Sequence, residues 1–151
     1  MTKQTEVRKY LADVIRGFET ASEFSSNVPA SHVVEGFDAV SFGQTRDSSF
    51  PKVYVQLILK QRNLLPARRV LVEADYVIIA SFRPVSISGV IKSAADQLEE
   101  FTDDVEIALG RRAAGFVEQL HLEEIANDGG TLAPEANAVF RIFASWKEEQ
   151  R

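Results

Sequence analysis

The chain has 151 residues, 45% of them hydrophobic and 26% charged, which is an ordinary composition for one globular domain with a buried core. It contains no cysteine, which excludes a disulfide framework, thiol chemistry and cysteine ligands for zinc. Its net charge of −5 argues against nucleic acid as the main ligand, because phosphate binding favours a basic surface. We predict a single domain over residues 1–151, with no readable signal peptide or membrane span.

The first predicted element is an amphipathic helix over residues 6–19. Its apolar residues recur at the spacing of one helix face: Val7, Tyr10, Leu11, Val14, Ile15 and Phe18. Residues 20–50 are rich in serine, and two stretches in them, 22–29 and 43–49, are predicted to be loops. Between these stretches, residues 32–42 contain enough valine and phenylalanine for a short strand.

Two strands are predicted next, over residues 51–60 and 69–82. Both are rich in valine, isoleucine and tyrosine, and both alternate in hydrophobicity as strands do. Residues 61–68 have the length of a generous hairpin loop, so the two strands are expected to be antiparallel neighbours.

A second helix is predicted over residues 88–109. Its buried stripe is expected to comprise Ile91, Ala94, Leu98, Phe101, Val105 and Leu109. Ser93 and Asp96 have the spacing of a capping box, so an alternative start for the regular helix is Ser93.

Strands over residues 116–126 and 137–147 complete the chain, and Trp146 is expected to be buried or at a subunit interface. Hairpins on either side of a helix favour an α+β fold, a mainly antiparallel sheet with two helices packed on one face.

Catalytic motifs are not apparent. The sequence has no Gly-x-Ser-x-Gly elbow and no phosphate-binding loop, and Gly129-Gly130 is read as a turn. His121, Glu123 and Glu124 could form a metal or proton-transfer site, but a shared solvent-exposed strand face explains them more simply. We therefore expect no catalytic residue, no metal site and no cofactor.

Two charged surfaces stand out instead. Carboxylates cluster on the second helix, where Asp96 to Asp104 lie on one arc that includes Asp96, Glu99, Glu100 and Asp103. Basic residues surround the tip of the first hairpin, with two leucines between them: Lys60, Arg62, Leu64, Leu65, Arg68 and Arg69. The acidic arc is read as a solvated or partner-facing surface. The hairpin tip is either a solvated loop or a contact arm with charges for steering and leucines as an anchor.

The order of elements resembles that of bacteriophage tail terminator proteins of the lambda gpU type, also called minor tail protein U or tail completion protein. The resemblance rests on the closing strand over residues 135–146, the first helix over residues 7–15 and the strand over residues 51–55. It implies a structural virion protein of the tail or neck, assembled in the host cytoplasm. Such a protein forms a ring, usually a hexamer, that caps the tail tube and stops its polymerisation.

The partners that the resemblance implies are other copies of the chain, the tail tube protein and the head-tail connector protein. DNA would at most pass through the ring channel, and no membrane is involved. Another ring-forming connector or neck protein remains an alternative. A small α+β enzyme or ligand-binding module is the alternative from a different class.

Overall fold

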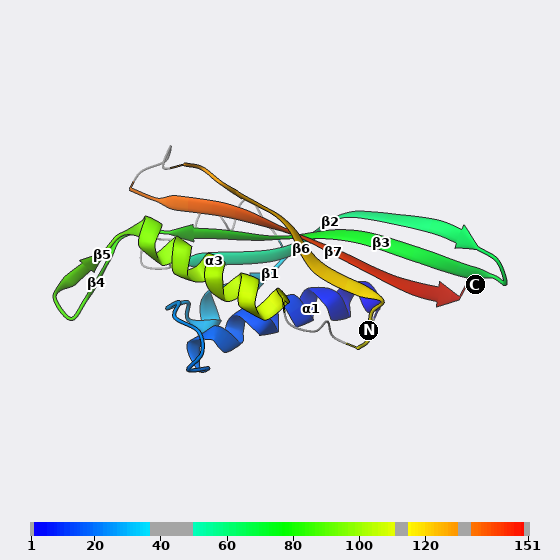
Figure 1. Cartoon of the computed structure of the whole chain (residues 1–151), viewed down its shortest axis with the longest axis horizontal. Helices are drawn as coiled ribbons and strands as arrows, with labels where there is room; N and C mark the ends of the chain where they lie inside the picture. The colour runs from blue at the N-terminus through cyan, green and yellow to red at the C-terminus, as the bar shows by residue number, and fades with distance from the viewer. Residues whose placement is uncertain (1, 37–49, 111–114, 130–133, 150–151) are drawn as a thin grey trace.

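The computed structural model describes residues 2–36, 50–110, 115–129 and 134–149 (Figure 1). Five strands form one sheet in the order β1-β2-β3-β7-β6, in which only β1 and β2 are parallel. The helices α1 and α3 lie on one face of this sheet (Figure 1). The predicted α+β fold, with a mainly antiparallel sheet and two helices on one face, is therefore confirmed. The elements are α1 (Lys3–Arg16), β1 (Val33–Glu35), β2 (Lys52–Leu65), β3 (Arg69–Phe82), β4 (Val85–Ile87), β5 (Val90–Lys92), α3 (Ala94–Gly110), β6 (Gln119–Asn127) and β7 (Ala136–Glu149), with short 3-10 turns at Gly17–Glu19 and Ala30–His32.

Helix α1 starts earlier in the chain than predicted. The hydroxyl of Thr2 accepts a hydrogen bond from the backbone N–H of Thr5 at 3.2 Å, which satisfies one of the free amides at the helix start. The regular helix ends at Arg16, and residues 17–19 continue as a 3-10 turn. The sequence pattern did identify the apolar stripe correctly, since Val7, Leu11 and Ile15 are buried.

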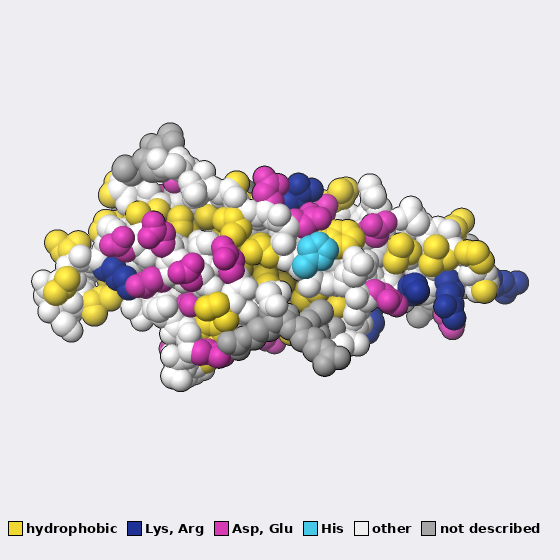
Figure 2. All heavy atoms as spheres, viewed as in Figure 1, with side chains coloured by type: hydrophobic (Ala, Val, Ile, Leu, Met, Phe, Trp, Pro, Cys, Tyr) yellow, Lys and Arg dark blue, Asp and Glu magenta, His cyan; other side chains and the backbone are white. Residues whose placement is uncertain are grey.

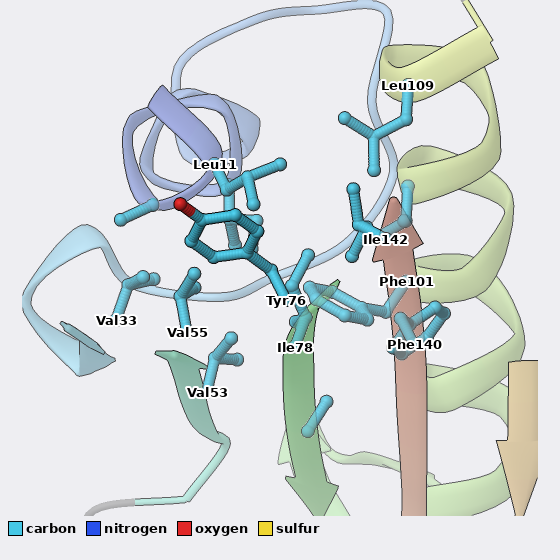
Figure 3. Close-up of a cluster of buried hydrophobic side chains, with 14 of the residues drawn as sticks. Leu11, Val33, Val53, Val55, Tyr76, Ile78, Phe101, Leu109, Phe140 and Ile142 are labelled. Carbon is cyan, nitrogen blue, oxygen red and sulfur yellow. The ribbon is translucent and has the colours of Figure 1, made fainter. Parts of the chain in front are cut away.

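The core fills the space between the two helices and the sheet (Figure 3). Phe101 of α3 is central to it, because its ring lies 5.5 Å from that of Phe140, 5.6 Å from Phe82 and 5.9 Å from Phe18. These aromatic contacts join both helical segments to the two middle strands. Trp146 is 1% exposed, so the prediction that it is buried is confirmed.

The predicted loop over residues 61–68 is wrong, because most of it is strand. Strand β2 continues to Leu65, and β3 begins at Arg69, which leaves only a three-residue turn. Ala67 and Arg68 adopt left-handed backbone conformations, with φ of 64° and 58°. The two strands thus form a long hairpin that extends well beyond the helices (Figure 1). In the described part of the chain, β1 is the strand that borders β2 on its outer side, and it covers only Val53–Val55.

The start of the second predicted helix is also wrong. Helix α3 begins at Ala94, and the hydroxyl of Ser93 accepts a hydrogen bond from the N–H of Asp96 at 3.1 Å. This agrees with the later start that the capping pattern had offered as an alternative. The preceding residues form a separate hairpin, β4–β5, so Ile91 is 76% exposed rather than part of the buried stripe.

The remaining strands lie close to where they were predicted. Strand β7 pairs with β3 along its whole length, and β6 pairs with the outer side of β7. Of the helices that the structure describes, none is long and apolar enough to span a membrane.

Candidate assembly surfaces

The basic hairpin tip, defined as Lys60, Arg62, Arg68 and Arg69, lies at one end of the elongated molecule (Figure 2). All four side chains are exposed, but they differ in their surroundings. The Lys60 ammonium donates to the side-chain oxygen of Gln4 at 3.0 Å, which connects β2 to the start of α1. Arg68 and Arg69 stand on the turn itself and the first residue of β3, where a partner can reach them.

Arg62 has a structural role that the sequence did not indicate. Its guanidinium lies 3.1 Å from a carboxylate oxygen of Glu148, and the other oxygen of Glu148 accepts the indole N–H of Trp146 at 2.9 Å. In the strand register, Arg62 faces Val72 and Glu148 faces Val70, so the ion pair spans β3 on the helix face. Both valines are buried even though they lie in the extended part of the hairpin. Arg62 and Glu148 therefore help to hold the three strands together.

Large apolar side chains accompany the basic tip. Leu64 is 72% exposed, Leu59 49% and Ile58 47%, while Leu65 is half-buried. A register shift between Leu57 and Leu59 breaks the alternation of β2, which explains why two adjacent apolar residues, Ile58 and Leu59, are exposed there. The structure thus places Leu64 and Leu65 beside the basic residues of the hairpin tip, and the contact arm stays a prediction.

The acidic face of α3 comprises Asp96, Glu99, Glu100 and Asp103. Asp96, Glu99 and Asp103 are exposed, and Glu100 is half-buried and forms an ion pair with Lys92 of β5. Figure 2 shows acidic side chains gathered over α3, beside the β4–β5 hairpin. Asp96, Glu99 and Asp103 thus face solvent, and the sequence hypothesis of a partner-facing surface stays a prediction.

Asp104 does not belong to this exposed surface, and its assignment to the arc is wrong. Its carboxylate is buried, with the residue 1% exposed. It accepts hydrogen bonds from the backbone N–H of Ser26 at 2.7 Å, from the Ser26 hydroxyl, and from the N–H of Ser25 at 3.2 Å. Asp104 therefore fixes the loop after the first helical segment against α3, and this explains why a charged residue is buried.

The structure does not bring the basic tip and the acidic face together within one molecule. The hairpin tip lies at one end, and the first turn of α3 lies towards the other, next to β4 and β5 (Figure 1). Any contact between these two surfaces must therefore join different molecules.

The structure adds a third surface that the sequence analysis missed. The β4–β5 hairpin forms the end of the molecule opposite the basic tip, and every residue from 84 to 91 is exposed (Figure 1). Ser88 and Gly89 form its two-residue turn, with φ of 51° and 80°. Such a turn between apolar residues is typical of a tight hairpin, so a usable signal was present in the sequence.

The candidate catalytic residues lie on the open sheet face. His121 is about half exposed, its Nε2 lies 4.0 Å from a Glu123 oxygen, and its ring packs against Phe143 at 5.3 Å. A carboxylate oxygen of Glu124 instead lies 3.6 Å from a guanidinium nitrogen of Arg141. Within residues 2–36, 50–110, 115–129 and 134–149, no group of three histidine or acidic side chains is arranged to hold a metal ion.

An open hollow of about 360 Å³ lies near the start of α1, where Lys3, Phe116 and Trp146 contribute to its lining. Two further lining residues, Glu118 and Lys147, form an ion pair at 3.8 Å. The charges at this hollow thus have partners within the chain, since Lys3 also pairs with a glutamate one turn along α1.

The class defined by the fold is an α+β protein with exposed charged and apolar surfaces towards its two ends. Comparisons with protein-family models and with curated proteins give no match for this chain. The functional assignment therefore depends on the surfaces themselves and on the resemblance described above.

Proposed function

We propose that the chain is a structural protein of bacteriophage tails, a tail terminator that assembles into a ring of identical copies. In this role the ring caps the tail tube, ends its polymerisation and offers a docking face to the head-tail connector. DNA passes at most through its channel, and the assembled ring belongs to the virion. The resemblance in α1, β2 and β7 implies this role, and no catalytic step is needed for it.

The observation that supports the proposal best is the separation of opposite charges at the two ends of one subunit (Figure 2). A head-to-tail ring requires two different and complementary surfaces on each copy. The basic tip at one end and the acidic face of α3 towards the other meet that requirement. Complementary charges of this kind steer association and fix its register, although each exposed pair contributes only about 0–1 kcal/mol.

Electron microscopy of the purified protein, together with its mass in solution, tests ring formation directly. We expect closed rings, and addition of tail tube ends should produce capped tubes. A protein that remains a monomer or dimer at all concentrations, and does not bind tube ends, would contradict the proposal.

A charge-reversal variant tests the role of the two surfaces. Arg68→Glu combined with Arg69→Glu is the preferred change, because Arg62 already has a partner within the chain. We expect association to weaken by about tenfold or more at low salt, and by less at 1 M salt, where screening shortens the reach of charges. Lys9→Glu, an exposed change on α1, serves as the control and should assemble normally.

A second pair of changes asks whether the two surfaces touch. Glu99→Lys combined with Asp103→Lys should restore assembly to the Arg68→Glu, Arg69→Glu variant. If the tip variant assembles and caps tubes normally, the tip is only a solvated turn. If it fails and the charge swap does not rescue it, the tip contacts a surface other than α3.

A further inference from the structure

The β4–β5 hairpin exposes more apolar surface than folding of the chain requires. Val90 is 69% exposed and Ile91 76%, and Val85 and Ile87 are 39% and 41% exposed. In the strand register Ile87 faces Val90 and Ile91 faces Ser86. Val85, Ile87 and Val90 therefore share one face of the hairpin. Clustered apolar side chains on a projecting element are typical of a binding surface rather than of a solvated loop.

The hairpin is held in a fixed direction, although it contributes nothing to the core. The side-chain amide of Gln97 is 7% exposed and donates to the carbonyl of Arg83, just before β4, at 2.6 Å. The same amide nitrogen lies 3.3 Å from the carbonyl of Lys92, at the end of β5. Lys92 also forms an ion pair with Glu100. Both ends of the hairpin are therefore attached to α3, so the apolar face is presented without a large ordering cost on binding.

Exposed apolar side chains also lie at the other end of the molecule, on both faces of the distal half of β2. Leu64 is exposed on the same face as Arg62, whereas Leu59 is exposed on the opposite face, next to Ile58 at the register shift. For the residues that the structure describes, the outer edge of β2 beyond Val55 borders no other strand. The distal half of β2 therefore offers apolar side chains and open backbone groups to an incoming element.

We infer that the β4–β5 hairpin of one copy packs on the distal half of β2 of the next copy. This inference rests on the proposed ring and names the contact that builds it. Charge complementarity selects a second copy as the occupant: the hairpin is followed at once by the acidic face of α3, and the acceptor on β2 carries the basic tip. Docking the hairpin brings those opposite charges towards each other, and the contact is heterologous, as a closed ring requires.

The first test removes apolar surface from the hairpin. Ile87→Ser combined with Val90→Ser should weaken each subunit contact by about tenfold or more, because both side chains belong to the shared apolar face and would lose their burial in the contact. The control is Val34→Ser combined with Val139→Ser, two valines that are 44% and 40% exposed on other strands. The control should retain rings in electron microscopy and in mass measurements. The melting temperature of the hairpin variant should match that of the wild type, because its two side chains lie outside the core.

The second test identifies the acceptor by disulfide cross-linking. The chain has no cysteine, so every cross-link must come from introduced residues. Protein carrying Val90→Cys, on the apolar face of the hairpin, is mixed with protein carrying Leu64→Cys or Leu59→Cys, and diamide oxidises the two thiols to a disulfide. A disulfide forms only when the two Cα atoms come within about 7 Å. At least one of these pairs should cross-link about tenfold faster than a control pair in which Ser22→Cys, an exposed position, replaces Val90→Cys.

The outcomes separate this inference from the proposed function. If the wild type forms rings and the Ile87→Ser, Val90→Ser variant forms them equally well, the hairpin contact is wrong while the ring proposal stands. If the hairpin variant loses its rings but neither cysteine pair cross-links, the hairpin binds another surface or another protein, and the β2 acceptor is wrong. If the wild type never assembles, the inference and the ring proposal both fail.

Discussion

Removal of the Asp104 carboxylate should destabilise the fold much more than removal of any neighbouring carboxylate on α3. Asp104→Ala leaves the backbone N–H and the hydroxyl of Ser26 without their acceptor, and Ser26 is itself 5% exposed. A buried donor that loses its partner costs about 1–3 kcal/mol. Ser25 is exposed, so water can replace its lost acceptor. Two buried donors therefore predict a loss of about 3–4 kcal/mol, a large part of the 5–15 kcal/mol typical of a domain.

Equilibrium unfolding in urea measures this loss directly. Trp146 is the only tryptophan and is 1% exposed, so its fluorescence reports on the core. Asp104→Asn retains one acceptor oxygen and should lose only about 1–2 kcal/mol. Asp103→Ala, an exposed change one residue away, should change the free energy of unfolding by less than about 0.5 kcal/mol. Equal stabilities of Asp104→Ala and Asp103→Ala would refute the structural role of Asp104. Asp104 would then be a solvated carboxylate like its neighbours on α3.

Two further predictions concern stability. Burial raises the pKa of the Tyr76 phenol above its ordinary value of 10.0, so the stability that this group contributes is complete below pH 10 and is lost as the pH rises above it. Tyr76→Phe removes a 2.8 Å hydrogen bond to the Gln4 carbonyl and should lower the free energy of unfolding by about 1 kcal/mol at pH 7. The urea midpoint of this variant should nevertheless fall less between pH 9 and 11 than that of the wild type. Identical falls of the two midpoints would contradict this prediction. Glu148→Ala should cost about 1–2 kcal/mol, because it leaves the Trp146 indole N–H without its acceptor, whereas the exposed change Glu149→Ala should be nearly neutral in the same urea assay.

The fold was largely predictable because most elements have one buried face. The stripe on α1 and the alternation in β3 and β7 reflect burial against a single core, and periodicity detects that arrangement well. The length of the β2–β3 hairpin was not predictable in the same way. Residues 61–64 are exposed on both sides of the strand, so their sequence lacks the alternation that burial imposes.

The β4–β5 hairpin was missed for a different reason. Ile91 stands three residues before Ala94, so helical periodicity counted it as the first residue of the α3 stripe. The turn at Ser88-Gly89 gave the opposite indication, and local turn geometry prevailed over periodicity. Asp104 shows the corresponding limit for surfaces: its spacing matches that of its exposed neighbours, and only the contact with Ser26, far away in the chain, distinguishes it.

The basic residues along β2 have a consequence for solubility. An edge strand with open backbone groups invites the same strand of another molecule to pair with it, and repetition of that pairing leads to fibres. Here Lys60, Arg62 and Arg68 accompany the part of β2 that, in the described ranges, lies beyond its pairing with β1. Two such edges that approach each other bring like charges together and repel. The basic residues therefore disfavour pairing between the β2 edges of two molecules. They leave the edge accessible mainly to an element that carries the opposite charge.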